Sequence, residues 1–190
     1  MPIVRGMSRL VAVLAVFLAL AGTAAARGQG DPPPPASTEA PATRSIADVV
    51  DLELQVFVAV NGVRKEHGLS ALRLNRGLGE AARDHSRSMA EHGFFRHESY
   101  DGTAFWHRIR PMYKPMPRRY WRAGENMVWA SPGLSAAQAI DMWMKSPPHR
   151  KIILTPNWRD IGIGGVHAAA APGVYQGLGV TIVTADFGVR

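Results

Sequence analysis

Apolar residues recur at helical spacing through most of the chain, whereas β-branched residues dominate its last third. The helical spacing predicts long helices over Ile46–His67, Leu78–His92 and Ser135–Ser146. The first is apolar on more than one side, so we expect it to be buried between layers. Gly68 and Gly93 follow the first two helices directly, and glycine commonly ends a helix. A shorter helix with Phe105 and Ile109 is expected before Pro111.

The last third of the chain predicts strands, because Val, Ile, Thr and Gly dominate Ile161–His167 and Val174–Phe187. The loop between these segments is too short for a parallel crossover, so the two strands are expected to be antiparallel. Another short strand is predicted at Met127–Trp129. Helices followed by strands favour an α+β fold, in which helices cover an antiparallel sheet.

Two prolines mark the end of the last predicted helix. Pro147 and Pro148 directly follow Ser146, and proline cannot continue an α-helix. His149 is therefore expected on a stiff turn, where its imidazole would be presented to a binding or catalytic site. Taken alone, a histidine in a surface turn is the simpler explanation.

The N-terminal region has the pattern of a secretory signal peptide over residues 1–26. Arg5 and Arg9 precede an apolar run, and three alanines before Arg27 supply the small residues of a cleavage site. We therefore expect a secreted or periplasmic protein with no stable membrane span in the mature chain. An uncleaved anchor is the alternative, although the apolar run is short for a bilayer.

Residues 27–44 are rich in Pro, Ser, Thr, Ala and Gly, a composition typical of an extended linker. Residues 45–190 are then expected to form a single domain. This domain contains all 7 histidines, and the chain has no cysteine. Cysteine is thereby excluded as a nucleophile or metal ligand.

The net charge of +7 arises largely from a basic run that contains no acid. The run comprises Arg108, Arg110, Lys114, Arg118, Arg119 and Arg122. Such a run can bind nucleic acid, but we expect no nucleic-acid partner for an exported protein. Anionic cell-wall polymer or lipid headgroups are the better match, and a solvated loop is the simplest explanation.

His97, Glu125 and His149 are the candidate site residues, because each stands near a glycine or proline that ends an element. Element ends present polar groups, so we expect these side chains to converge on one cleft. Imidazoles and a carboxylate can hold a divalent metal such as zinc, with His97 and His149 as ligands. Without a metal, they would form a hydrogen-bonded network.

A serine nucleophile is a second interpretation, with Ser146 attacking and Glu125 as the orienting acid. The chain has no G-x-S-x-G motif, and Ser146 more simply caps a helix end. His85 shares a helix face with Ala82 and Met89, so it is expected to be a hydrogen-bonded core histidine.

The order of several short motifs resembles the CAP superfamily, which comprises cysteine-rich secretory proteins, antigen 5 and plant pathogenesis-related proteins, also called SCP domains. The motifs are Asn61-x-x-Arg64, Leu78 to Met89, Phe95-Arg96-His97, Gly124-Glu125-Asn126, Trp143-Met144-x-Ser146-Pro147-x-His149-Arg150 and Ile161-Gly162-Ile163-Gly164. Together they cover nearly the whole domain, and the absence of cysteine resembles the bacterial members.

The resemblance implies a three-layer α-β-α sandwich with a central antiparallel sheet and a large cleft. In the family, two histidines and two acids line this cleft, which holds a divalent metal in some members. The resemblance equates His97 with the first family histidine and Glu125 with the acid of the Gly-Glu-Asn motif. His149 matches the Ser-Pro-x-His-Arg motif of bacterial members and is expected near the second family histidine.

The second family acid is missing, because Ser146 stands in its place after Trp143. Either the site has one acid, or Glu98 or Asp101 substitutes for the second. The resemblance suggests an exported module that binds a lipid, a sterol or an anionic cell-envelope component. The alternative is a hydrolase for peptide or cell-wall substrates that uses the same cleft.

Overall fold

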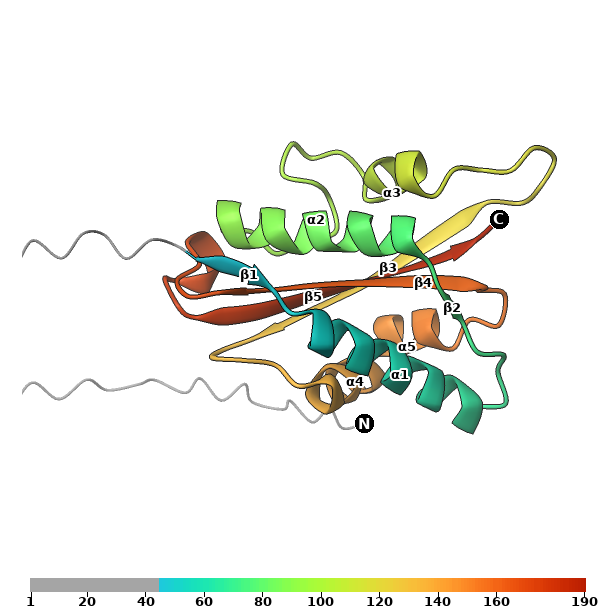
Figure 1. The fold of residues 1–190 in the computed structure, drawn as a ribbon, viewed down its shortest axis with the longest axis horizontal. Helices are drawn as coiled ribbons and strands as arrows, with labels where there is room; N and C mark the ends of the chain where they lie inside the picture. The colour runs from blue at the N-terminus through green and yellow to red at the C-terminus, as the bar shows by residue number, and fades with distance from the viewer. Residues whose placement is uncertain (1–44) are drawn as a thin grey trace, which may run out of the picture. The chain divides into compact units, whose positions relative to one another are not determined.

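The computed structural model describes residues 45–190, which fold around a five-stranded sheet (Figure 1). The predicted signal peptide and linker lie outside the described residues. None of the helices in the described part of the chain is long and apolar enough to cross a membrane.

The strand order is β1-β4-β5-β3, and β2 lies beside β4. The strands are β1 (Ile46–Asp48), β2 (Arg73–Leu74), β3 (Arg122–Ala130), β4 (Asp160–Ala168) and β5 (Val180–Val189). β5 pairs antiparallel with both β4 and β3, as predicted for the last two strands. The short β2 runs parallel to β4. β3 is therefore an edge strand of an essentially antiparallel sheet.

Helices cover both faces of the sheet (Figure 1). One face carries α2 (Arg76–His92) and α3 (Trp106–Met112). The other carries α1 (Val50–Glu66), α4 (Ala136–Lys145) and α5 (Pro147–Ile153). A short 3-10 helix, Gly173–Tyr175, precedes β5. The α+β, three-layer α-β-α arrangement is confirmed.

Local capping explains the ends of two predicted helices. The Asn75 side chain accepts a 3.1 Å hydrogen bond from the backbone N–H of Leu78 at the start of α2. Gly93 ends that helix in the left-handed conformation, with φ of 69°. Ser135 and Gln138 form the predicted capping box at the start of α4.

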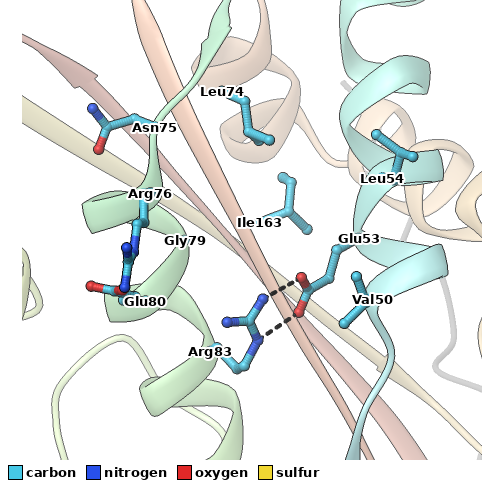
Figure 2. A pocket seen from close by; sticks show the side chains of 10 residues that line it. All are labelled: Val50, Glu53, Leu54, Leu74, Asn75, Arg76, Gly79, Glu80, Arg83 and Ile163. Carbon is cyan, nitrogen blue, oxygen red and sulfur yellow. Dashed lines mark hydrogen bonds and ion pairs between the residues drawn. The ribbon is translucent and has the colours of Figure 1, made fainter.

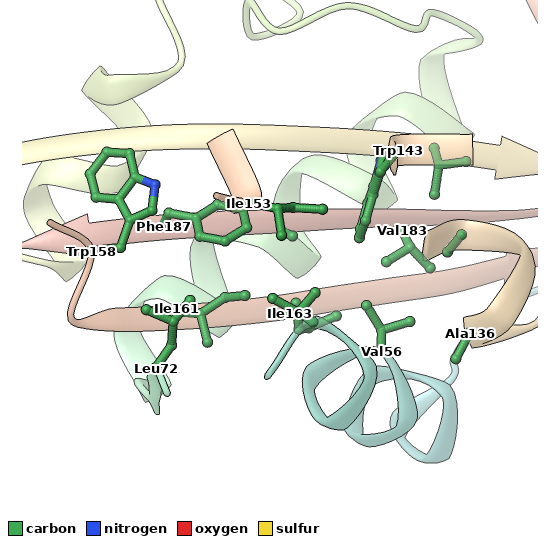
Figure 3. Close-up of a cluster of buried hydrophobic side chains, with 14 residues drawn as sticks. Val56, Leu72, Ala136, Trp143, Ile153, Trp158, Ile161, Ile163, Val183 and Phe187 are labelled. Carbon is green, nitrogen blue, oxygen red and sulfur yellow. The ribbon is translucent and has the colours of Figure 1, made fainter. Parts of the chain in front are cut away.

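Glycines of β4 allow α2 to lie directly on the sheet. A Cβ atom at Gly162 would overlap the backbone of Gly79, and one at Gly164 would overlap the backbone of Arg83. The alternating residues Ile161 and Ile163 point to the opposite face, where they join a buried core with α1, α4 and α5 (Figure 3). The Ile-Gly-Ile-Gly motif thus packs a helix closely on one face and fills the core on the other.

Two predictions about the first helix are wrong. Ile46–Asp48 forms strand β1 on the edge of β4, so the helix starts only at Val50. Val50 and Leu54 are 61% and 57% exposed, so α1 is not buried between layers. The sheet edge offers backbone partners to Ile46–Asp48, which helical spacing alone does not reveal.

The strand predictions need correction at their ends. β5 begins at Val180 and not at Val174, because Gly173–Tyr175 forms a 3-10 turn. β3 extends the predicted Met127–Trp129 strand to Arg122–Ala130, since its whole length pairs with β5.

The prediction for His149 is also wrong in its local structure. Pro147 and Pro148 end α4 but occupy the first turn of a new helix, α5. Proline is favoured there, because the first helical N–H groups need no partner within the helix. His149 is therefore part of a helix and not of a stiff turn. Pro111 likewise lies within α3.

Candidate functional site

The candidate site is built on edge strand β3, where successive side chains point to opposite faces of the sheet. Gly124 faces α5, and a Cβ atom there would lie 2.8 Å from the Trp158 ring. Glu125 faces the side of α2 and α3, whereas Asn126 donates a 3.0 Å hydrogen bond to the carbonyl of His149 in α5. Strand β3 thus contacts site residues on both faces of the sheet.

Glu125 is the centre of the site. Its side chain is 1% exposed, and its Oε1 atom lies 2.7 Å from Nδ1 of His97. Its Oε2 atom accepts a hydrogen bond from the guanidinium of Arg108 in α3. Both oxygens of the carboxylate are therefore engaged.

Arg108 contacts the His97 main chain as well as the Glu125 carboxylate. Its Nη1 atom donates a 3.1 Å hydrogen bond to the carbonyl of His97. The Arg108 side chain is only 14% exposed, and within residues 45–190 its Nε has no hydrogen-bond partner. Burial lowers its pKa, and the charge of Asp186 opposes this shift. Arg108 thus fixes His97 through the main chain and through Glu125.

Asp186 is the second acid of the cluster. It lies opposite Glu125 in the β3–β5 register, so the two side chains share one face. Asp186 is fully buried, and neither carboxylate oxygen has a hydrogen-bond partner in the described part of the chain. Burial raises its pKa to about 7, although the charges of Arg108 and His97 oppose the shift.

His97 is 47% exposed and joins the cluster to the solvent. Burial of the ring lowers the pKa of His97, and the positive charge of Arg108 lowers it further. The negative charges of Glu98 and Asp186 oppose this shift. A neutral ring donates Nδ1–H to the Glu125 carboxylate, because that carboxylate can only accept. The lone pair on Nε2 then remains available as a base or ligand.

His149 is half-buried and approaches from α5. Burial lowers its pKa, and the charge of His97 adds to the effect. The structure therefore brings His97 and Glu125 into direct contact. It ties His149 to the same strand through its main chain, near enough for His97 to affect its protonation.

The other sequence candidates have separate roles. Ser146 joins two helices, accepting from Arg150 N–H through its carbonyl and donating its N–H to Trp143. Asp101 is exposed and bonds to Thr103 through its carboxylate, so it does not replace the second acid. Glu98 is exposed and lines the cleft beside His97.

His85 is a core histidine, as predicted. It is 2% exposed, and its Nε2 lies 3.0 Å from the carbonyl of Arg96. Burial lowers its pKa to about 3, and the charge of Arg108 contributes to the shift.

A cleft of about 510 Å³ opens beside this cluster at the β3 edge. Its walls include the apolar side chains of Phe105, Ile152 and Trp158. Arg122 and Lys151 contribute exposed cations, and the Arg122 guanidinium lies 5.1 Å from the Trp158 ring centroid. The cleft can therefore hold an apolar group and a negative charge together.

A pocket of about 640 Å³ lies at the other edge of the sheet, between α1 and α2 (Figure 2). The ion pair between Glu53 and Arg83 lies at this pocket, with Oε2 2.5 Å from Nη2. The Glu53 carboxylate also accepts from the backbone N–H of Gly165 at 2.8 Å. Because these charges satisfy one another and none of the site residues lines the pocket, we assign the functional site to the smaller cleft.

The cluster does not fit a divalent metal as it is arranged. Within residues 45–190, no group of three or more His, Asp and Glu side chains is placed to hold a metal ion. Both oxygens of Glu125 are engaged, and Arg108 adds a fixed positive charge where an ion would approach. The assignment of His97 and His149 as metal ligands stays a prediction.

Sequence reasoning missed Arg108 and Asp186. Arg108 was grouped with the basic run, although its side chain is only 14% exposed and its neighbours in that run are exposed. Asp186 is the single acid within the apolar strand β5. A lone acid in a strand that is apolar on both faces signals a buried carboxylate, and this signal could have identified Asp186.

Comparison with known proteins adds a family match. Residues 57–184 match the family model described as the cysteine-rich secretory protein family, CAP. The chain is 32% identical to the uncharacterized protein YkwD of Bacillus subtilis over 129 residues, which cover 67% of this chain and 48% of YkwD. It is 28% identical to the membrane protein YlbC of the same organism over 112 residues, covering 59% and 31% of the two chains. It therefore spans about half of YkwD and a third of YlbC.

Solved structures share the fold. An extracellular protein of Bacillus anthracis that contains an SCP domain superposes with a TM-score of 0.58 and 23% identity, covering 74% of this chain and 41% of that one. An outer surface protein of Borrelia burgdorferi superposes with a TM-score of 0.61 and 17% identity, covering 78% and 99%. The likeness extends across nearly all of the Borrelia protein.

Proposed function

Because the chain belongs to the CAP family of cysteine-rich secretory proteins, we propose that it is an exported binding module. Its ligand is an amphiphile with an acidic group, such as an anionic lipid or another acidic component of the cell envelope. The observation that carries this proposal is the lining of the β3-edge cleft. There the apolar side chains of Phe105, Ile152 and Trp158 stand beside the exposed cations Arg122 and Lys151.

The charge balance of the cleft supports an acidic ligand. Glu125 is 2% exposed and neutralised by its contact with Arg108, so it presents little negative charge. Glu98 is the one exposed acid among the residues that line the cleft, against Arg122 and Lys151. Each cation near an anionic lipid surface contributes about 1 kcal/mol of attraction.

Export is supported by the N-terminal pattern of arginines, apolar run and alanines. The descriptions of the structural neighbours as an extracellular protein and an outer surface protein agree with it. A ligand in the cell envelope would be within reach of such a protein.

Calorimetric titration with single-chain lipids below their micelle concentrations tests the proposal. Lysophosphatidylglycerol should bind about tenfold or more tightly than lysophosphatidylcholine, because two cations favour the anionic headgroup. The double variant Arg122→Gln/Lys151→Gln should lose this preference. The matched control Lys65→Gln/Arg119→Gln removes the same charge from exposed positions outside the cleft and should keep it. Equal affinity of the unaltered protein for both lipids would refute the proposal.

A hydrolase acting on peptide or cell-wall substrates is the second candidate, favoured by the 2.7 Å contact between His97 and Glu125. A neutral His97 oriented by a carboxylate can act as a general base on water. A zinc-bound water would need His97 and His149 to rearrange into a common metal site, because the cluster as arranged does not fit a metal. A serine mechanism would need Ser146. Once an activity is in hand, assays of His97→Ala, His149→Ala and Ser146→Ala separate these mechanisms. A binding module should retain its ligand in all three variants.

A further inference from the structure

Arg108 is a largely buried cation within an acidic cluster. Its guanidinium contacts Glu125, and its charge opposes the burial-driven shift in the pKa of Asp186. It also donates a 3.1 Å hydrogen bond to the His97 carbonyl. One positive side chain thus contacts one acid and the backbone of a histidine, and its charge also acts on a second acid.

A divalent ion at this site would draw its ligands from Glu125, Asp186 and His97, and one oxygen of Glu125 now accepts a hydrogen bond from Arg108. Glu125 and Asp186 are opposed in the β3–β5 register, and His97 contacts Glu125 through Nδ1. Carboxylate oxygens and imidazole nitrogen are suitable ligands for Zn²⁺. The Arg108 guanidinium already contacts Glu125. It would therefore repel a divalent cation at the same place, and this repulsion is strong in a poorly solvated site.

We propose that Arg108 is the resident cation of this cleft and replaces the divalent ion that the cluster would otherwise attract. An arginine suits this role because it is always protonated and its planar donor group matches a carboxylate. The 14% exposure of its side chain indicates that it is part of the packed site and not a mobile surface group. The cleft of this chain therefore operates without a metal.

Zinc titration by calorimetry at pH 7.5 tests this assignment, with circular dichroism to verify folding. The unaltered protein should bind no zinc ion through the cluster, so His97→Ala and Glu125→Gln should leave its zinc isotherm unchanged. Arg108→Ala should gain one site per chain that is about tenfold or more tighter than any site in the unaltered protein. Adding Glu125→Gln to Arg108→Ala should remove that site. Arg110→Ala, an exposed change on the same helix, should gain nothing.

Two results would overturn the proposal. The first is a zinc site in the unaltered protein that His97→Ala or Glu125→Gln abolishes. The second is a folded Arg108→Ala protein that gains no site. Should Arg108→Ala unfold, Arg108→Gln removes the charge with a smaller loss of volume and is judged by the same criterion. The titration of the unaltered protein decides the question even if neither variant folds, because it alone reveals whether the cluster is already a zinc site.

Discussion

Glu125 and Asp186 occupy directly opposed positions on β3 and β5, and both carboxyl groups are buried. Like charges in such a pair destabilise a sheet unless they are compensated. Arg108 and His97 contact Glu125, whereas burial raises the pKa of Asp186 to about 7. The repulsion between the two carboxyl groups is therefore reduced in two ways: Arg108 compensates the charge of Glu125, and Asp186 is partly protonated near pH 7.

The first prediction concerns Asp186. Its folded-state pKa is raised from 3.8 to about 7, so protonated Asp186 favours the folded state. This contribution is fully present below about pH 4 and is lost as pH rises through 7. Asp186→Asn should therefore stabilise the protein at pH 8 by up to about 4 kcal/mol and have little effect at pH 4.

Urea unfolding of the unaltered protein and Asp186→Asn at both pH values measures this difference. Asp141→Asn alters an exposed aspartate on α4 and should change stability little at either pH. An Asp186→Asn effect of the same size at pH 4 and pH 8 would contradict the assignment of a raised pKa.

The second prediction concerns His85, whose pKa is lowered from 6.5 to about 3 by burial. The unfolded chain takes up a proton at this residue below about pH 6.5, while the folded protein does not. The free energy of unfolding should thus fall as pH drops, by about 1.4 kcal/mol per pH unit from this residue. His85→Gln should remove that slope, observed as a smaller loss of stability between pH 6 and pH 4. Unchanged pH dependence would show that His85 does not titrate as described.

Between about pH 4 and 6.5 the contributions of Asp186 and His85 have opposite signs. Each variant should therefore expose the slope of the remaining group: stability should rise with pH in Asp186→Asn and fall with pH in His85→Gln, relative to the unaltered protein.

The third prediction concerns the contact of α2 with β4. A Cβ atom at Gly164 would overlap the backbone of Arg83. Since backbone cannot yield as a side chain can, Gly164→Ala should destabilise the protein by about 1–3 kcal/mol. Gly62→Ala is the matched control in α1, where a Cβ atom has nothing within 4 Å, and it should stabilise by about 0.5–1 kcal/mol. Thermal unfolding distinguishes the two, and equal effects would contradict the close approach.

Local signals explain which elements could be predicted from sequence. Asn75 and Gly93 cap α2 through contacts within a few residues, so the ends of that helix could be predicted. β1 and β2 are very short and exist because β4 offers them an edge, which no local pattern encodes. Pro147 correctly marked the end of α4, but its equal suitability for a helix start was overlooked.

The candidate site was predictable in part for the same reason. His97 follows Gly93, which ends α2, but Glu125 lies inside β3 and not at the element end that Gly124 was expected to mark. The structure nevertheless joins the two side chains directly. Arg108 was treated as one of several basic residues, because only the packing of α3 against β3 separates it from the exposed ones. Asp186 could not be assigned to the site in this way, because only the register of β3 and β5, which lie far apart in sequence, places it opposite Glu125.

The final prediction concerns where the ligand binds. The chain has five tryptophans, whose indole N–H resonances can be followed by ¹⁵N nuclear magnetic resonance. Trp158 and Trp143 are both buried, and each indole N–H donates a 2.9 Å hydrogen bond to a backbone carbonyl. Of the two, Trp158 lines the β3-edge cleft and Trp143 does not. Titration with lysophosphatidylglycerol should shift the Trp158 indole and the Gly124 amide saturably and leave the Trp143 indole in place. Saturable shifts confined to Gly79 and the other residues of the α1–α2 pocket, or no shift at Trp158, would contradict binding at the β3 edge.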